Sequence, residues 1–222
     1  MMKPTVVVSN LRKSYGQGES KVEVLKGINL NIEKGEKLAL IGKSGSGKST
    51  LLSLLAGLDS PDSGDIIVQD QKISSMSERD LTNFRASHMG IVFQQFHLVS
   101  TLTALENVLL PLELLKRPNA MTTAKNLLES VGLGHRCHHV PSQLSGGESQ
   151  RVAIARALAI NPAILFADEP SGNLDEETGD KVMDLLFKMV QDTGTTLVLV
   201  THDPDLAKKC SRVVHLEHGS LL

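Results

Sequence analysis

The chain has few of the side chains that a nucleic-acid-binding protein needs. It contains no tryptophan, one tyrosine and five phenylalanines, so little ring surface is available to stack on bases. Its 23 lysines and arginines are outnumbered by 25 aspartates and glutamates, whereas nonspecific binding to nucleic acid requires a basic excess. The composition therefore argues against nucleic acid as a partner.

Cysteines and long apolar runs are also scarce. Cys137 and Cys210 lie far apart without metal-site spacing, which is typical of free thiols in a reducing compartment. No apolar run approaches the roughly twenty residues that cross a bilayer. Met1–Pro4 leads into a strand-like segment without the apolar region of a signal peptide. We expect a soluble cytoplasmic protein that reaches a membrane only through a partner.

A glycine-rich loop between a strand and a helix is the strongest motif. It follows the apolar run Leu38–Ile41, and its nine residues are Gly42, Lys43, Ser44, Gly45, Ser46, Gly47, Lys48, Ser49 and Thr50. This context predicts a phosphate-binding P-loop, because glycines and a helix N-terminus let backbone N–H groups converge on one anion. Lys48 would reach the β- and γ-phosphates of a nucleotide, and the Ser49 hydroxyl would ligate Mg²⁺. The alternative is a chance Gly/Ser loop.

Adjacent carboxylates follow a second apolar strand. The run Ala163–Ala167 ends in Asp168 and Glu169, and burying charges at such a place is costly unless they serve another charge. Asp168 fits a direct or indirect Mg²⁺ ligand, and Glu169 would polarise a water beside the γ-phosphate. The alternative is an ordinary turn at the end of a strand.

Two more strand-like runs end in polar residues. Gln94 follows Met89–Phe93, and its amide either contacts Mg²⁺ or water beside the γ-phosphate or caps the edge of the sheet. His202 follows Thr196–Val200, at the strand end where open α/β sheets bind ligands.

A second helix start has the composition of an anion site. Leu144–Gln150 places a Ser-Gly-Gly run before a helix, although a serine-capped helix start explains the same pattern. Two anion-binding helix starts that are far apart in sequence can serve one nucleotide only if they meet in space, for example across a dimer.

The N-terminal region predicts an antiparallel β-layer. Thr5–Val8 reads as a strand, and Val22–Leu25 and Ile28–Ile32 read as short strands on either side of a turn at Lys26–Gly27. Tyr15, the only tyrosine, either stacks on an adenine or is a half-buried strand aromatic, since aromatic rings serve both uses.

The alternation of strands and helices stops in the middle of the chain. Thr103–Arg117 and Met121–Val131 have helical spacing, so we expect a helical insertion at approximately residues 98–162. Pro111 and Pro118 should kink or end these helices.

Together these motifs resemble the nucleotide-binding subunit of an ATP-binding-cassette (ABC) transporter over nearly the whole chain. Six motifs follow one another in the order found in this family: the P-loop, the Gln94 loop, the Leu144–Gln150 signature, the Ile164–Glu169 strand, the Asp175 loop and His202. The resemblance implies an α/β fold in one domain, residues 1–222. Its parts would be a P-loop NTPase core with a RecA-like mixed sheet flanked by helices, an antiparallel β-layer and an α-helical subdomain.

The resemblance also implies roles for individual residues. Tyr15 would stack on the adenine of ATP, and His202 would contact the γ-phosphate. Gln94 would couple Mg²⁺ and the attacking water to the helical subdomain. Ser145 and Gly147 would contact the nucleotide held by a second subunit. Asp175 would join these nucleotide-binding residues.

Shorter motifs resemble one subgroup, the lipoprotein-releasing and macrolide-exporter ATPases: Gly57–Asp59, Thr103–Val108, Leu144–Glu148 and Gly172–Asp175. Within it, Gly16–Gly18, Phe166–Glu169 and the brief tail look most like an ATPase encoded beside a large permease. One departure from the general family pattern is Glu148 in place of glutamine, which the subgroup shares.

The resemblance therefore implies an ATPase that forms a head-to-tail homodimer around two ATP molecules. The dimer would drive an integral-membrane permease of the exporter or lipoprotein-release type, at the inner face of the cell membrane. We expect the permease to dock on Phe96, Leu98, Val99 and Leu102, unless these residues pack inside the helical subdomain.

Two rivals remain. A soluble ABC ATPase of DNA repair or translation is one, but the interval between P-loop and signature is short and the chain has one cassette. The other is a regulator without turnover, against which Glu169 and His202 argue.

Overall fold

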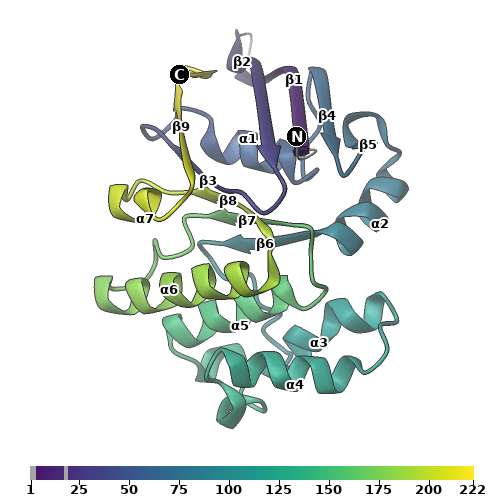
Figure 1. The fold of residues 1–222 in the computed structure, drawn as a ribbon, viewed down its shortest axis with the longest axis vertical. Coiled ribbons are helices and arrows are strands. Elements are labelled where there is room, and N and C mark those ends of the chain that lie inside the picture. The colour runs from purple at the N-terminus through teal and green to yellow at the C-terminus, as the bar shows by residue number, and fades with distance from the viewer. Residues whose placement is uncertain (1–3, 18–19) are drawn as a thin grey trace. The chain divides into compact units, whose positions relative to one another are not determined.

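The structure is a computed structural model that describes residues 4–17 and 20–222. Met1–Lys3, where we expect no signal peptide, and Gly18 of the subgroup pattern lie outside the described residues. The chain divides into two compact units, residues 1–85 with 195–222 and residues 86–194. Helices and strands carry the labels of Figure 1.

The first unit contains the predicted antiparallel layer. Its four strands run in the order β2-β1-β4-β5. They are β1 (Pro4–Gln17), β2 (Ser20–Glu33), β4 (Ser63–Val68) and β5 (Gln71–Lys72). Residues that alternate along β1 and β2, such as Val6, Val8 and Ile32, are buried on one face, as expected for a sheet that covers a core.

The predicted turn at Lys26–Gly27 is wrong. β2 runs through it without a break, and Leu11 pairs with Ile28 while Arg12 pairs with Lys26. Gly27 is thus the extra residue of a β-bulge, with φ +86°, a conformation that glycine adopts without strain. Pairing with β1 accommodates the glycine that local sequence marks as a turn.

The same unit contains a set of mainly parallel strands. β3 (Lys37–Ile41) pairs in parallel with β8 (Thr196–Val200) on one side and with β9 (Arg212–Glu217) on the other. Helix α1 (Lys48–Leu55) buries four leucines and contacts β8. The short helix α7 (Pro204–Lys208) follows β8. A last strand, β10 (Ser220–Leu221), pairs antiparallel with β9.

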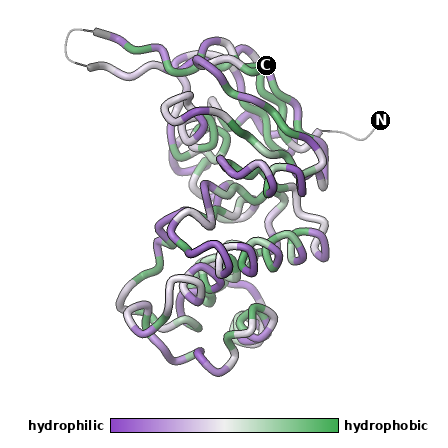
Figure 2. Tube along the Cα trace, turned by 90° about the vertical axis from the view of Figure 1, so that its left-hand side faces the viewer, coloured by the Kyte–Doolittle hydropathy of each residue, from purple (hydrophilic) through white to green (hydrophobic). Residues whose placement is uncertain are grey.

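The second unit contains a parallel strand pair. β6 (Met89–Phe93) and β7 (Ile164–Asp168) end together, with Phe93 opposite Asp168. Helix α2 (Glu78–His88) leads into β6. Helix α6 (Glu176–Thr193) follows β7 and buries Val182, Met183, Leu186 and Val190, as an amphipathic helix does. Hydrophilic and hydrophobic residues alternate along the helical parts of the trace in Figure 2.

Three further helices form the rest of this unit: α3 (Ala104–Leu114), α4 (Ala120–Ser130) and α5 (Gly146–Leu158). They share an apolar core with members from each helix, among them Val108, Leu128 and Val152. All three lie within the predicted insertion at 98–162. Single-turn 3₁₀ helices occupy Ile73–Ser75, Gly134–Arg136 and Pro141–Gln143.

Pro111 lies inside α3 and does not end it. The helix continues to Leu114, held by the buried side chains of Leu105, Val108 and Leu112. A capping box between Thr103 and Glu106 fixes its start. Tertiary packing and capping therefore outweigh the lost hydrogen bond of one proline.

Candidate functional site

The predicted P-loop connects β3 to α1 in a conformation that only glycine tolerates at three positions. Gly42, Gly45 and Gly47 have φ of +155°, +77° and +103°. A Cβ on Gly42 would lie 2.2 Å from the Leu216 carbonyl oxygen, so the loop also needs a glycine for close packing. Gly47 is the N-cap of α1 and provides no side-chain cap, and the N-terminus of a helix favours binding of an anion.

Lys48 and Ser46 give this loop the polar groups of an anion site. Lys48 is buried, and its Nζ donates to the carbonyl oxygens of Gly42 and Lys43 at 2.9 and 3.1 Å. The buried Oγ of Ser46 has no hydrogen-bond partner among the described residues. A hydroxyl without a partner and a fixed ammonium group at an uncapped helix start fit the phosphates of a nucleotide.

The neighbouring strand ends bring two more segments to the P-loop. Leu40 pairs with Val200, so the loop after β3 and the exposed His202 after β8 leave the same edge of the sheet. On the other side, Leu216–His218 at the end of β9 and Lys43–Ser46 line a hollow of about 160 Å³. His202 and the P-loop therefore leave the same edge of the sheet in the first unit, and a contact of His202 with a ligand stays a prediction.

Tyr15 is held by a small polar network in the first unit. Its hydroxyl donates to Oδ2 of Asp59 at 2.8 Å, and Thr50 of the P-loop helix also hydrogen-bonds to this hydroxyl. The buried Lys13 donates to Oδ1 of Asp59 at 2.7 Å and lies 5.0 Å from the centre of the Tyr15 ring. The network connects β1 to the start of α1.

The charges of this network depend on each other. Burial and the hydrogen bond to Asp59 raise the pKa of Tyr15. Burial alone would raise the pKa of Asp59, but hydrogen bonds from Lys13 and Tyr15 outweigh it and hold that pKa below its usual value. Tyr15 remains 42% exposed. One ring face lies under the Lys13 ammonium group, so stacking on a base would use the other face.

The strand ends of the second unit carry the other predicted catalytic residues. Gln94 directly follows β6, and Asp168 is the last residue of β7. Glu169 comes next, with φ +43°, a strained conformation for a residue with a side chain. The Gly172 N–H donates to the Glu169 carbonyl oxygen at 2.9 Å and closes the turn. Gln94, Asp168 and Glu169 thus leave one edge of a parallel strand pair.

A residue that the sequence analysis did not single out holds Gln94. Asn173 accepts from Nε2 of Gln94 and donates to its backbone oxygen, both at 3.0 Å. Gly172 makes this approach possible, because a Cβ there would lie 2.8 Å from Nε2 of Gln94. In the sequence, Gly172 and Asn173 are part of the Gly172–Asp175 motif of the subgroup, and this motif alone does not indicate a contact with Gln94.

The signature segment is a capped helix start. Ser145 Oγ accepts from the Glu148 N–H at 3.2 Å, and the Ser145 N–H donates to Oε2 of Glu148 at 2.8 Å. The hydrogen bond from the Ser145 backbone is the main cause of the lowered pKa of Glu148, and Arg136 adds an ion pair at 3.1 Å. Ser145 is exposed. The serine cap that sequence offered as an alternative is present, and a nucleotide contact stays a prediction.

Gly147 and Asp175 also have local structural roles. A Cβ on Gly147 would lie 2.4 Å from Cγ2 of Thr178, so a glycine is needed where α5 passes α6. Asp175 is the N-cap of α6, and its side chain accepts from the Thr178 N–H at 3.0 Å. This hydrogen bond lowers the pKa of Asp175. Their contacts with nucleotide stay predictions.

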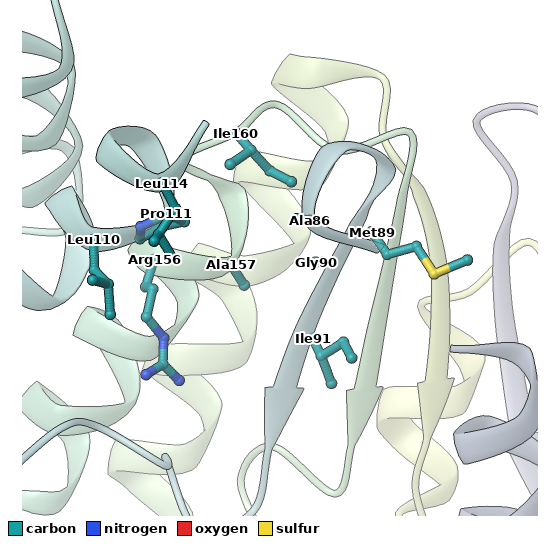
Figure 3. A pocket seen from close by; sticks show the side chains of 10 residues that line it. All are labelled: Ala86, Met89, Gly90, Ile91, Leu110, Pro111, Leu114, Arg156, Ala157 and Ile160. Atoms are coloured by element: carbon teal, nitrogen blue, oxygen red, sulfur yellow. The ribbon is translucent and has the colours of Figure 1, made fainter. Parts of the chain in front are cut away.

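An apolar groove lies in the second unit (Figure 3). It encloses about 240 Å³, and its lining residues are Ala86, Met89, Gly90, Ile91, Leu110, Pro111, Leu114, Arg156, Ala157 and Ile160. Leu114 is 73% exposed. Arg156 is the one charged residue in the lining, and its guanidinium donates to the carbonyl oxygens of Phe96 and His97 at 2.9 and 2.6 Å.

The predicted docking residues separate into two groups. Phe96 and Leu98 line a second hollow, of about 490 Å³. Val99 and Leu102 do not line it; their carbonyl oxygens accept hydrogen bonds from the fully buried amide of Asn107. Leu98 also packs against the helical core. The second hollow thus includes half of the expected surface.

The described residues contain no group of three or more histidines, cysteines, aspartates and glutamates that could hold a metal ion. Mg²⁺ in a nucleotide site is bound through one or two protein groups together with phosphate oxygens and water. Ser49 is exposed in the first turn of α1, and Asp168 ends β7. Both offer the oxygen atoms that Mg²⁺ prefers.

Comparisons with known proteins agree with these motifs. The model of the family described as "ABC transporter" matches residues 25–172. YbbA of Escherichia coli, named an uncharacterized ABC transporter ATP-binding protein, is 52% identical, with 97% of this chain and 96% of the relative covered. LolD of Geobacter metallireducens, a lipoprotein-releasing system ATP-binding protein, is 47% identical, with 100% and 99% covered.

A solved structure agrees as well. The ATP-binding cassette MJ0796, a dimer in a post-hydrolysis state bound to ADP and Pi, has a TM-score of 0.90 and 43% sequence identity, with 97% of this chain and 96% of that chain covered. The expected ABC ATPase fold and the resemblance to YbbA- and LolD-like proteins are thus confirmed. The chain belongs to the ABC transporter family, as an ATP-binding subunit that hydrolyses ATP.

Proposed function

We propose that four side chains carry out the hydrolysis of ATP by this subunit: Lys48, Gln94, Glu169 and His202. Lys48 contacts the β- and γ-phosphates, and His202 contacts the γ-phosphate. Glu169 accepts a proton from the water that attacks the γ-phosphorus, and the bond to the β-phosphate oxygen breaks. The remaining P-loop groups hold the phosphates through backbone N–H donors.

One observation carries this proposal. In each unit, two polar segments leave the carboxyl ends of adjacent parallel strands: the P-loop and His202 after β3 and β8, and Gln94 and Glu169 after β6 and β7. Ligands of α/β sheets bind at such edges. Side chains placed there by buried strands are positioned rigidly, as phosphoryl transfer requires.

In this proposal, Mg²⁺ would be held by oxygen atoms of the Ser49 hydroxyl, the Asp168 carboxylate and the Gln94 amide. When bound, the ion supplies positive charge that neutralises the phosphates. Tyr15 stacks on the adenine through the ring face away from Lys13.

We further propose that two copies of this chain close head to tail around two ATP molecules. Support comes from the dimeric state of the MJ0796 cassette and from the exposed start of α5 at Ser145, where N–H groups can face an anion. Ser145, Gly147 and Asp175 would then serve the nucleotide of the partner subunit. ATP binding would favour the dimer, and hydrolysis would open it.

The partner of this dimer is an integral-membrane permease in our proposal, of the exporter or lipoprotein-release type. LolD is named as part of a lipoprotein-releasing system. None of the helices in the described part of the chain is long and apolar enough to cross a bilayer. A separate membrane subunit would therefore couple hydrolysis to transport, and this ATPase would lie at the inner face of the membrane. The similarity to ABC transporter ATP-binding proteins favours this function over that of a soluble ATPase of DNA repair or translation.

The apolar groove of Figure 3 is the better candidate for the docking surface. Nine of its ten lining residues are uncharged, and Leu114 presents an exposed apolar side chain, as expected for a surface that a short apolar helix covers. Arg156 connects the groove wall to the carbonyl oxygens of Phe96 and His97. A helix seated there can displace the loop that follows Gln94.

Two measurements test these proposals. Lys48→Ala should abolish ATP binding by the chain, measured by titration with a fluorescent nucleotide, whereas intact affinity would contradict the P-loop role. Leu114→Glu should abolish co-purification of the permease with folding and basal ATPase unchanged. Val99→Glu, on the surface that sequence favoured, is the matched control and should leave co-purification intact. The opposite result would move docking to the Phe96–Leu102 loop.

A further inference from the structure

The end of each strand in the second unit is held by one buried side chain, that of Gln150 on α5. Its Nε2 donates to the Pro170 carbonyl oxygen at 2.6 Å and to the Phe93 carbonyl oxygen at 3.4 Å. Gln150 is fully buried. Since both partners are carbonyl oxygens, the amide nitrogen must face them, which fixes the orientation of the side chain.

The two carbonyl groups stand next to the proposed catalytic residues. The Phe93 carbonyl belongs to the peptide bond that begins Gln94, directly after β6. Pro170 follows Glu169, and its ring fixes the backbone torsion between the Glu169 peptide and the carbonyl that Gln150 holds. Glu169 has the strained φ of +43°, and such a conformation persists only where the surroundings hold it.

A role in stability alone does not explain why position 150 is a glutamine. The Oε1 atom of Gln150 is buried with no hydrogen-bond partner among the described residues, and such an orphaned acceptor lowers stability. Most of the other buried positions of α5 are apolar, and Val152, Ala153 and Ile154 are fully buried. An apolar side chain at 150 would avoid the cost but would leave both carbonyl groups without this donor.

We propose that Gln150 is a positioning residue for hydrolysis. From α5, the helix that begins in the signature segment, its side chain holds the backbones of Gln94 and Glu169 in fixed positions relative to each other. This inference rests on the proposed roles of Gln94 and Glu169. Because the signature helix carries Gln150, a shift of α5 would move both strand ends together. Loss of the donor should displace the Glu169 carboxylate from the attacking water, and ATP affinity at the P-loop should stay the same.

Gln150→Met tests this role, because methionine has a similar length and no donor. We expect kcat to fall by about 10- to 100-fold, the range typical of a misplaced catalytic group, with the dissociation constant of ATP within about twofold of wild type. Val152→Ala is the control: it removes buried volume from the same helix without touching either carbonyl group. Val152→Ala should lower the melting temperature. At assay temperatures below its melting temperature, its kcat should equal that of wild type.

A double-mutant cycle separates positioning from general destabilisation. In a Glu169→Gln background, Gln150→Met should cause little further loss of single-turnover hydrolysis, since its effect acts through Glu169. Full additivity, or wild-type kcat in Gln150→Met, would overturn the proposal. If Glu169→Gln itself keeps wild-type turnover, the general-base assignment fails instead.

Gln150→Glu provides a second variant if Gln150→Met does not fold. A protonated carboxyl can donate to the Pro170 carbonyl oxygen, whereas a carboxylate repels it, so activity relative to wild type should recover as the pH falls. A ratio of Gln150→Glu activity to wild-type activity that does not change with pH would contradict the proposal. Failure of both variants to fold would make Gln150 a folding residue and would also overturn it.

Discussion

Gln94 and Asn173 exchange two hydrogen bonds of 3.0 Å. The Gln94 amide nitrogen is used by Asn173, so Gln94 would offer its amide oxygen to a cation, which is the atom type that Mg²⁺ prefers. Asn173 lies in the loop before α6, 79 residues from Gln94 in sequence. Its position makes it an orienting partner for the proposed Mg²⁺ contact.

Asn173→Ala should raise the Mg²⁺ concentration needed for half-maximal ATPase activity by about tenfold, as is typical when an orienting partner of a ligand is lost. ATP binding without Mg²⁺ should not change, because the P-loop groups are untouched. The measurement is a Mg²⁺ titration of steady-state hydrolysis. Asn31→Ala, at an exposed position of β2, is the control. An Asn173→Ala protein with the Mg²⁺ dependence of wild type would refute the orienting role.

Tyr15→Ala should weaken nucleotide binding by roughly 1–3 kcal/mol if the ring stacks on the base. Tyr15→Phe keeps the ring but loses the hydrogen bond to Asp59, so its affinity should lie between those of wild type and Tyr15→Ala. Discrimination between ATP and GTP should be modest, because stacking reads few hydrogen bonds. The measurement is an equilibrium titration of wild type, Tyr15→Phe and Tyr15→Ala with nucleotide. Unchanged nucleotide affinity in Tyr15→Ala would make Tyr15 an ordinary strand aromatic.

The sequence predicted those features that depend on local pattern. The P-loop and the runs that form β6, β7 and β8 each have a composition that admits few other structures. At Gly27, pairing with β1 determines the backbone conformation, and the local pattern wrongly predicted a turn.

The partners of the site residues could not be predicted in the same way. Asn173, Gln150 and Asp59 each act on a residue more than 15 positions away in sequence, and no local propensity records such a contact. The available signal for Gln150 was a polar residue on a helix face that is otherwise mostly apolar. Gln150 and Asn107, both fully buried, interrupt inward helix faces, and each donates to carbonyl oxygens of a neighbouring loop.

Acid should weaken the start of α5 through Glu148. The folded state holds the pKa of Glu148 below its ordinary value of 4.5, so the stabilisation from this carboxylate is complete above that value. It is lost as the pH falls through the lower, folded-state pKa. Thermal melts of wild type and Glu148→Gln from pH 7 down to about pH 3 should therefore converge in acid. Other carboxylates with lowered pKa, such as Glu106 and Asp175, are common to both proteins and cancel. A constant difference between the two melting temperatures would contradict the assignment.

The most direct test is ATP turnover and oligomeric state of Glu169→Gln, measured on the same preparation with Mg²⁺ and ATP. The amide keeps the shape of Glu169 but cannot accept the proton from water. We predict loss of nearly all hydrolysis, ATP affinity equal to that of wild type, and accumulation of an ATP-bound dimer in size-exclusion chromatography. Wild-type turnover by Glu169→Gln, or a chain that stays monomeric while saturated with ATP, would contradict the account.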